Sequence, residues 1–163
     1  MWLRVVLVAV AALLLGASHA FAARPLLAEL LARAPVNTGE PAKMSPLALE
    51  ACLRTARVLD ATGTAIDYEI AAIDRETAEA IFLENRINAE IPVLGGYDES
   101  GLNAFQKRLI RHEELTKKFK AEFPVYQQKK KAYDAAVAEF DCNCGQGFTA
   151  SDLGAAKAKL GIQ

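Results

Sequence analysis

The sequence predicts an all-α protein: a long antiparallel two-helix coiled-coil hairpin with a short C-terminal helix, clamped at its base by a disulfide. Three observations support this fold class. Apolar residues recur every three or four positions over two stretches of similar length, at 49–87 and 102–144. A short segment with proline and glycine separates the two stretches. The stretches also carry opposite net charge, which favours their packing side by side.

Residues 1–22 have the features of a secretory signal peptide. Arg4 supplies a positive charge, the run Val5–Leu15 is apolar, and small residues follow it. Cleavage is expected just before Ala23, where the tripeptide AFA satisfies the small-x-small rule; the tripeptide SHA, two residues earlier, is the alternative. An uncleaved membrane anchor is the other interpretation, but the apolar run is shorter than the roughly 20 residues that span a bilayer. We therefore expect a periplasmic or secreted protein with no stable membrane insertion after cleavage.

Composition restricts the possible partners of the mature chain. Removal of residues 1–22 leaves 18 basic and 20 acidic side chains, a net charge of about −2. This balance argues against general nucleic-acid binding, which requires an excess of Lys and Arg. The remaining length fits one domain, and we divide it into a short helical stretch with a linker at 23–44 and a helical hairpin domain at 45–163. Export implies an oxidising compartment, so the cysteines are expected to form disulfides.

The first long helix is expected to begin at Pro46 and to end before Pro92. Ser45 can accept hydrogen bonds from the first turn, and Pro46 has no N–H group to leave unpaired. A stripe of mainly apolar positions then runs for about six heptads with gaps of three and four, which predicts a coiled-coil seam. Its members are Leu49, Cys52, Ala56, Leu59, Gly63, Ile66, Ile70, Ile73, Thr77, Ala80, Glu84 and Ile87.

The segment IPVLGGYDESG at 91–101 is expected to break the helix, because Pro92 and the glycine pair disfavour it. Asp98 or Ser100 can cap the helix that follows. Tyr97 has no partner in either stripe, and Val93 and Leu94 lie beside it in the same segment. We therefore predict that they form an exposed tip that can bind a partner.

The second long helix repeats the same spacing and is expected to stop at Gly145. Pro124 lies inside it and should kink it, because proline removes one backbone hydrogen bond. Thr149 can cap a short third helix, with Asp152 three residues on. The stripe of the second helix contains Leu102, Phe105, Leu109, His112, Thr116, Phe119, Phe123, Tyr126, Lys130, Tyr133, Val137, Phe140 and Cys144.

An antiparallel register in which the numbers of facing residues sum to 196 matches the two stripes. Gly63 then faces Tyr133 and leaves room for the ring, which explains a glycine that costs roughly 1 kcal/mol in a helix interior. Glu84 faces His112, and this pairing predicts a buried or half-buried ion pair.

The same register places Cys52 opposite Cys144, and we predict that these two form the disulfide. Closure of a loop of about ninety residues is worth on the order of 4 to 5 kcal/mol in the chain-entropy model. A bond between Cys52 and Cys142 is the alternative, since it needs a shift of two residues that Pro124 could supply. A local bond between Cys142 and Cys144 would be strained.

The charges agree with an antiparallel pair. Residues 46–90 carry nine acids and four arginines, whereas residues 101–135 carry nine bases and four acids. The basic run at 129–131 is therefore interpreted as a helix flank that complements the acidic helix, and not as a lipid or nucleic-acid patch.

The sequence does not point to an enzyme or to a cofactor. Catalysis needs groups that converge in a concave site, and a two-helix hairpin offers none. Two thiolates in the Cys142-x-Cys144 pair could bind Cu(I), as in a metallochaperone. His112 cannot join such a site, because thirty-two residues of helix separate it from Cys144, roughly 48 Å. With Cys52 expected in a disulfide, we expect no metal site.

The chain resembles a group of uncharacterised exported proteobacterial helical-hairpin proteins with a clamp between two cysteines. The resemblance covers residues 45–153 and is carried by the signal, by a Cys in the first turns of a long helix, and by EFPVYQQKKKAYDAAVAEF followed by FDCNC. It implies the hairpin fold and a disulfide through Cys144, but no activity; Cys142 departs from the pattern.

Three functions remain from this reasoning. The first is a non-enzymatic structural or interaction protein of the cell envelope, which needs a protein partner or self-association because a bare two-helix seam buries little core. The second is a periplasmic holdase or assembly chaperone. The third is the Cu(I) metallochaperone.

Overall fold

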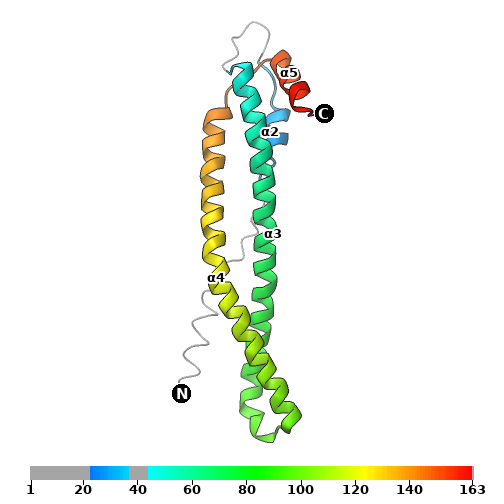
Figure 1. Ribbon diagram of the computed structural model, residues 1–163, viewed down its shortest axis with the longest axis vertical. Helices are drawn as coiled ribbons and strands as arrows, with labels where there is room; N and C mark the ends of the chain where they lie inside the picture. Colours follow the sequence, from blue (N-terminus) through cyan, green and yellow to red (C-terminus); the bar gives the residue numbers. More distant parts are fainter. Residues whose placement is uncertain (1–22, 37–43, 163) are drawn as a thin grey trace. The chain divides into compact units, whose positions relative to one another are not determined.

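The computed structural model describes residues 23–36 and 44–162, in which every element is helical, as the sequence predicts (Figure 1). The helices are α2 (Leu26–Ala32), α3 (Pro46–Glu90), the 3₁₀ helix η1 (Ile91–Gly96), α4 (Glu99–Cys144) and α5 (Ala150–Leu160). The expected signal peptide at 1–22 and the central part of the expected linker, 37–43, lie outside the described residues.

The chain divides into two compact units, and this division crosses both long helices. The described part of unit 1 is 68–127: the second part of α3, η1 and the first part of α4. The described part of unit 2 is 23–36, 44–67 and 128–162, which contains α2, α5 and the remaining parts of α3 and α4. The sequence predicts one hairpin domain at 45–163, and each of the two units contains part of it.

The helices begin and end at the residues expected from capping rules. The Ser45 hydroxyl accepts a hydrogen bond from the backbone nitrogen of Ala48 at 3.2 Å, at the start of α3. Of the two candidate caps for α4, Asp98 is the one used: its carboxylate accepts from the backbone nitrogen of Gly101 at 2.8 Å. α4 ends at Cys144, directly before Gly145.

α5 has both of its ends capped. Thr149 accepts a hydrogen bond from the backbone nitrogen of Asp152 at 3.1 Å, and its hydroxyl donates to the Asp152 carboxylate at 2.6 Å. At the other end Gly161 adopts a left-handed conformation with φ of 62°, which glycine reaches at low cost. The predicted third helix is confirmed.

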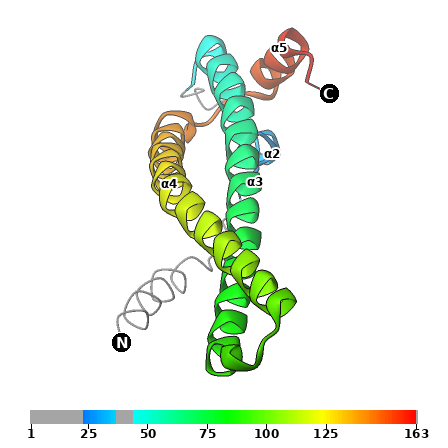
Figure 2. The same ribbon diagram turned by 60° about the horizontal axis from the view of Figure 1, so that its bottom comes forward.

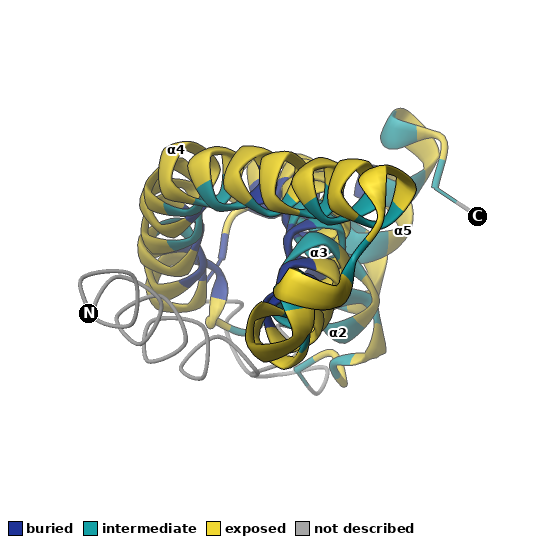
Figure 3. Cartoon of the chain, turned by 90° about the horizontal axis from the view of Figure 1, so that it is seen from below, coloured by how far each residue is buried: buried dark blue, intermediate teal, exposed yellow. Residues whose placement is uncertain are grey.

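In unit 2, α3 and α4 run antiparallel in the predicted register. Cys52 is bonded to Cys144, and Gly63 lies against Tyr133, so both contacts join residues whose numbers sum to 196. The buried residues of each helix lie along one side of it, while exposed residues cover the opposite side (Figure 3). The buried apolar residues of unit 2 are Leu26, Leu30, Met44, Leu49, Cys52, Leu53, Ala56, Leu59, Ile66, Tyr133, Val137, Phe140, Cys144, Phe148 and Ala156.

Unit 2 is thicker than a helix pair. α2 lies beside α3 in both ribbon views (Figures 1 and 2), and two of its leucines, Leu26 and Leu30, are fully buried. Phe148, in the loop between α4 and α5, is also almost fully buried. These additional segments cover a further side of the α3–α4 pair in unit 2. More apolar surface is therefore buried than two helices could bury alone.

In unit 1 the two helix segments also run antiparallel, because residues late in α3 pair with residues early in α4. Glu90 pairs with Arg108, and Glu76 pairs with Lys118. The compact part of the core consists of Ala80, Leu83, Ile87 and Leu115, with Phe105 packed against it. Unit 1 thus has a smaller core than unit 2.

The predicted stripe of α4 is only partly buried in unit 1. Leu102 and Leu109 are 47% and 38% exposed, whereas Leu115, which the sequence did not place in the stripe, is buried. Of the stripe residues in this part of α4, Tyr126 is buried. α4 therefore presents a different side to α3 than strict heptad spacing indicates. α4 also continues through Pro124 as a helix.

We predict opposite effects for two glycine substitutions. A Cβ atom at Gly63 would lie 2.6 Å from the Cβ atom of Ala23 and 2.8 Å from the Tyr133 hydroxyl, so Gly63→Ala should lower stability by about 1 to 3 kcal/mol through overpacking. Gly154 has open space around it, so Gly154→Ala should raise stability by up to about 1 kcal/mol through helix propensity. Urea unfolding of both variants measures the difference. A stabilising Gly63→Ala would contradict the close approach.

Candidate functional site

The disulfide joins the first turns of α3 to the last residue of α4. Cys52 and Cys144 are bonded with their Cα atoms 5.7 Å apart, and 92 residues separate them in the sequence. Cys142 is an exposed free cysteine. The sequence left two partners open for Cys52. The structure has the bond to Cys144, which is the partner given by the register in which the numbers of facing residues sum to 196.

The same bond argues against the Cu(I) metallochaperone, which would need both Cys142 and Cys144 as thiolates. The sulfur of Cys144 is oxidised, so Cys142 and Cys144 cannot offer two thiolates to a soft metal. Within 23–36 and 44–162, no group of three or more His, Cys, Asp and Glu side chains is arranged to hold a metal ion.

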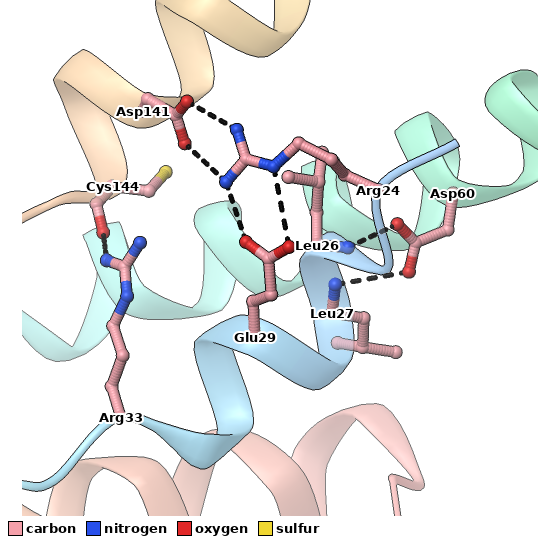
Figure 4. Close-up of polar contacts among 8 residues, drawn as sticks. All are labelled: Arg24, Leu26, Leu27, Glu29, Arg33, Asp60, Asp141 and Cys144. Atoms are coloured by element: carbon pink, nitrogen blue, oxygen red, sulfur yellow. Dashed lines mark hydrogen bonds and ion pairs between the residues drawn. The ribbon is translucent and has the colours of Figure 1, made fainter. Parts of the chain in front are cut away.

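The first turn of α2 is held by an acidic side chain of α3, Asp60 (Figure 4). α2 begins at Leu26 after Pro25, which has no side-chain cap to offer. Asp60 of α3 replaces it: one carboxylate oxygen accepts from the backbone nitrogen of Leu26 at 2.7 Å and the other from that of Leu27 at 3.1 Å. A carboxylate at a helix N-terminus is also favoured by the helix dipole. Asp60 therefore fixes where α2 starts.

Arg24 links the segment before α2 to α4. Its guanidinium group binds Glu29 of α2 at 2.6 Å and Asp141 of α4 at 2.7 Å (Figure 4). The hydrogen bonds to Glu29 and then to Asp141 raise the pKa of Arg24, so it stays fully charged. After α2, Arg33 donates to the backbone carbonyl of Cys144 at 2.5 Å. The segment at 23–33 thus contacts α3 and α4 close to the disulfide.

Asp67 of α3 contacts the first described residue. Its Oδ2 atom accepts a hydrogen bond from the backbone nitrogen of Ala23 at 3.0 Å. The Ala23 side chain lies in the space that the missing side chain of Gly63 leaves, next to Tyr133. Burial, together with the negative charge of Asp60, raises the pKa of Tyr133, so the phenol stays protonated.

α5 is fastened to the beginning of α3. Glu50 binds Lys159 of α5 at 2.6 Å and Arg54 of α3 at 2.6 Å. The hydrogen bond from Lys159, and then that from Arg54, lowers the pKa of Glu50. A groove of about 240 Å³ lies between these helices, and its lining includes Ala155 and Ala156 beside Glu50 and Lys159. Its volume is below the roughly 300 to 1,000 Å³ of ordinary small-molecule pockets.

Ion pairs on the flanks of unit 1 link acidic α3 to basic α4, as the charge pattern predicts. Arg111 binds Glu79 at 2.8 Å, and this hydrogen bond lowers the pKa of Glu79 and raises that of Arg111. Burial alone would raise the pKa of Glu90, but hydrogen bonds from Arg86 and Arg108 lower it overall. Exposed pairs of this kind contribute little stability individually. They do favour the antiparallel orientation over the parallel one.

The predicted ion pair between Glu84 and His112 is not formed. Glu84 is buried, but no ion pair or hydrogen bond joins it to His112, whose Nε2 atom is buried without a hydrogen-bond partner among the described residues. Leu115 occupies the position that packs against Ala80, Leu83 and Ile87. Because an apolar side chain gains more from this position than an imidazole does, α4 is turned so that His112 lies at the edge of the contact.

The predicted tip residues differ in exposure. Val93 is 54% exposed, as expected, whereas Leu94 and Tyr97 are only half-exposed. The Tyr97 ring lies over Gly101, within 3.1 Å of the position a Cβ atom would take there. The expectation that Tyr97 stands free at the tip is therefore wrong, because the first turn of α4 gives the ring a surface to pack on.

Most exposed large apolar side chains belong to unit 1. Eight of the ten among the described residues lie at 68–127, and only Leu47 and Val58 belong to unit 2. The eight are Tyr68, Phe82, Ile91, Val93, Leu102, Leu109, Ile110 and Val125. We call three of these, Val93, Leu102 and Ile110, the apolar end residues of unit 1.

No protein-family model, curated protein or solved structure matches this chain. The resemblance to exported helical-hairpin proteins therefore stays a prediction. In the part of the chain that the structure describes, no helix combines the length and the apolar character needed to cross a membrane.

Sequence reasoning missed the acidic residues that hold the N-terminal segment. Asp60 and Asp67 each follow a stripe residue, Leu59 and Ile66, and lie seven residues apart. That spacing puts both carboxylates on one side of α3, two turns apart. Two acidic residues at heptad spacing beside an apolar stripe were the sequence signal that could have indicated a contact of α3 with a further segment.

Removal of the disulfide should destabilise the chain, and removal of the third cysteine should not. Cys52→Ser is expected to cost about 2 to 5 kcal/mol, because a long closed loop is opened. Cys142→Ser, which changes an exposed thiol, should stay within about 0.5 kcal/mol. Thermal unfolding measures both, and peptide mapping without reductant should show Cys52 linked to Cys144. Predominant linkage to Cys142 would contradict the register.

Loss of the Lys159 contact should have a pH-dependent effect. A carboxylate whose pKa is lowered in the folded state adds stability above its unfolded pKa, and this stability is lost as pH falls below about 4.5. Lys159→Met should therefore destabilise the chain at pH 7, and the difference from the original chain should shrink as pH falls through this range. Lys157→Met, on the same helix, is the matched control. A difference that is constant from pH 7 to pH 3 would refute the role of Glu50.

Proposed function

We propose that this chain is an exported, non-enzymatic helical-hairpin protein that acts by binding a protein in the cell envelope, in the periplasm or outside the cell. The observation that carries the proposal is the uneven distribution of exposed apolar side chains, eight of ten of which lie in unit 1. Exposed apolar groups gain free energy when a protein partner covers them.

The charged side chains and the disulfide of unit 2 support a structural role for that unit. Arg24, Asp60 and Asp141 bind other parts of their own chain, and so does Glu50. Cys52 and Cys144 are joined. These groups hold segments of the chain to one another, whereas catalysis needs groups that converge on an open, concave site.

Unit 1 offers the surface for recognition. Its core is small, its last turns of α3 and first turns of α4 carry exposed Phe82, Leu102 and Ile110, and the connection between them exposes Ile91 and Val93. The occupant that fits these groups is an apolar protein surface or a second copy of the chain. Single exposed apolar residues are common on monomers, whereas apolar residues gathered in one region of the surface often mark a protein-interaction site.

A periplasmic holdase is the second candidate, and the same exposed apolar residues favour it. A holdase binds many unfolded clients through apolar surface, whereas an interaction protein binds a defined partner. Suppression of the aggregation of a model client at stoichiometric ratio supports the holdase. Inertness in that assay, together with a defined complex or oligomer, supports the interaction protein.

Replacement of the apolar end residues should abolish binding without unfolding the chain. We expect Val93→Ser, Leu102→Ser and Ile110→Ser together to remove the captured partner, or to dissociate the oligomer. Each change is at an exposed position and should cost no more than about 0.5 kcal/mol. Affinity capture from an envelope extract and analytical ultracentrifugation measure the loss.

Leu47→Ser with Val58→Ser provides the matched control, since both residues are at least as exposed but belong to unit 2. Binding should survive in this variant. Equal loss in both variants would show that general stickiness, and not a surface of unit 1, accounts for the capture.

A further inference from the structure

One carboxylate of unit 2 has fewer hydrogen-bond donors than its surroundings require. The Oδ1 atom of Asp67 is buried and has no hydrogen-bond partner among the described residues. Its Oδ2 atom accepts from the backbone nitrogen of Ala23 at 3.0 Å. A carboxylate oxygen removed from water without a donor is costly, and desolvated carboxylates in proteins are normally paired with a cation.

The cationic side chain nearest to Ala23 in the sequence is engaged elsewhere. Arg24, the next residue along the chain, has its guanidinium group between Glu29 and Asp141 (Figure 4). Within the described ranges, no lysine or arginine forms an ion pair with Asp67. The group that does reach Asp67 is the backbone nitrogen of Ala23, and in an intact peptide bond that nitrogen has a single N–H to donate.

Cleavage of the signal peptide would change the chemistry of this nitrogen. Hydrolysis of the bond between Ala22 and Ala23 by a signal peptidase consumes one water: the carbonyl carbon of Ala22 takes the oxygen and becomes a carboxylate. The nitrogen of Ala23 gains hydrogens and becomes an α-ammonium group. An ammonium group has three donors and a positive charge, so it can serve both oxygens of Asp67 and neutralise their charge.

The position of Ala23 is fixed from several sides. Its methyl group fills the space beside Gly63, where a Cβ atom would lie only 2.6 Å away. Immediately after it, Arg24 is bound to α4, and the backbone nitrogen of Leu26 is bound to Asp60. An N-terminal group held this way loses little further conformational entropy when it pairs, because its neighbours are already ordered.

We propose that Asp67 is the binding site for the α-ammonium group that cleavage after Ala22 creates, so that removal of the signal completes the packing of unit 2. The proposal rests on export only for the origin of the free N-terminus. It also selects between the two cleavage sites. Cleavage after SHA would leave two residues ahead of Ala23, whose nitrogen would remain a peptide N–H with one donor.

The test compares two chains that differ only at the N-terminus. One begins at Ala23, released from a cleavable fusion, and the other carries Gly-Ser before Ala23, which keeps the peptide bond. At pH 6.5 a free α-amine, whose ordinary pKa is about 7.7 to 8, is protonated. We expect the chain that begins at Ala23 to melt about 3 to 6 °C higher, the shift that a pair of this kind gives in a chain of this size.

Asp67→Asn in both chains isolates the interaction. It should remove the difference between the two N-termini, whereas Asp74→Asn, at an exposed position of the same helix, should preserve it. If Asp67→Asn does not fold, the comparison of the two unaltered chains still decides. Equal melting temperatures for these, or a difference that survives Asp67→Asn, would overturn the proposal.

Sequencing of the N-terminus of the protein recovered from the envelope gives the second arm. The first residue should be Ala23, and a chain that begins at Phe21 or retains residues 1–22 would overturn the assignment. Both arms are independent of partner capture, so failure of this proposal and failure of the proposed function can be told apart.

Discussion

The spacing between α3 and α4 in unit 2 is the constraint on which the other contacts of that unit depend. Two features with different chemistry set it: the covalent bond between Cys52 and Cys144, and the close approach of Gly63 to Tyr133. The N-terminal segment then binds both helices, through Asp60 of α3 and Asp141 of α4. A change of register would move these two carboxylates past each other by 1.5 Å for each residue and break the bridge that Arg24 makes.

The two units differ in how much apolar surface they bury around the helix pair. A helix pair buries only one side of each helix, which leaves little apolar surface removed from water. Unit 2 adds α2, α5 and the loop with Phe148, and its buried residues are correspondingly numerous. The described part of unit 1 adds η1, and fewer of its apolar residues are buried: Ile70, Ile73, Ala80, Leu83, Ile87, Leu115 and Tyr126. Ion pairs on its flanks fix orientation but contribute little stability, because they are largely exposed.

This difference connects the fold to the proposed function. The ionisable groups of unit 2 serve to hold its own segments together, and the disulfide keeps them in place when the surroundings change. The apolar groups of unit 1 are those for which a partner would provide the missing burial. The small core of unit 1 and its exposed apolar surface thus have one physical cause: its described part, 68–127, has no further layer of structure over the helix pair.

The sequence by itself determined the helices, their ends and most of their buried sides, because these depend on contacts between near neighbours in the chain. Capping by Ser45, Asp98 and Thr149 and the stripe of α3 follow from local rules. Size and charge matching along the two stripes also favoured Cys144 as the partner of Cys52, but the sequence left Cys142 open, and the tertiary structure decided between them.

The tertiary structure alone decided which residues of different segments meet. The docking of α2 on Asp60 and the contact of Ala23 with Asp67 join segments more than thirty residues apart, and no periodicity encodes them. Leu115 replaced His112 at the centre of unit 1 because burial of an apolar side chain outweighs heptad spacing. The Tyr97 ring packs on Gly101, because this contact buries part of its apolar surface. Local patterns state which side of a helix is apolar, whereas the competition among all apolar groups for limited contact area decides which of them are buried.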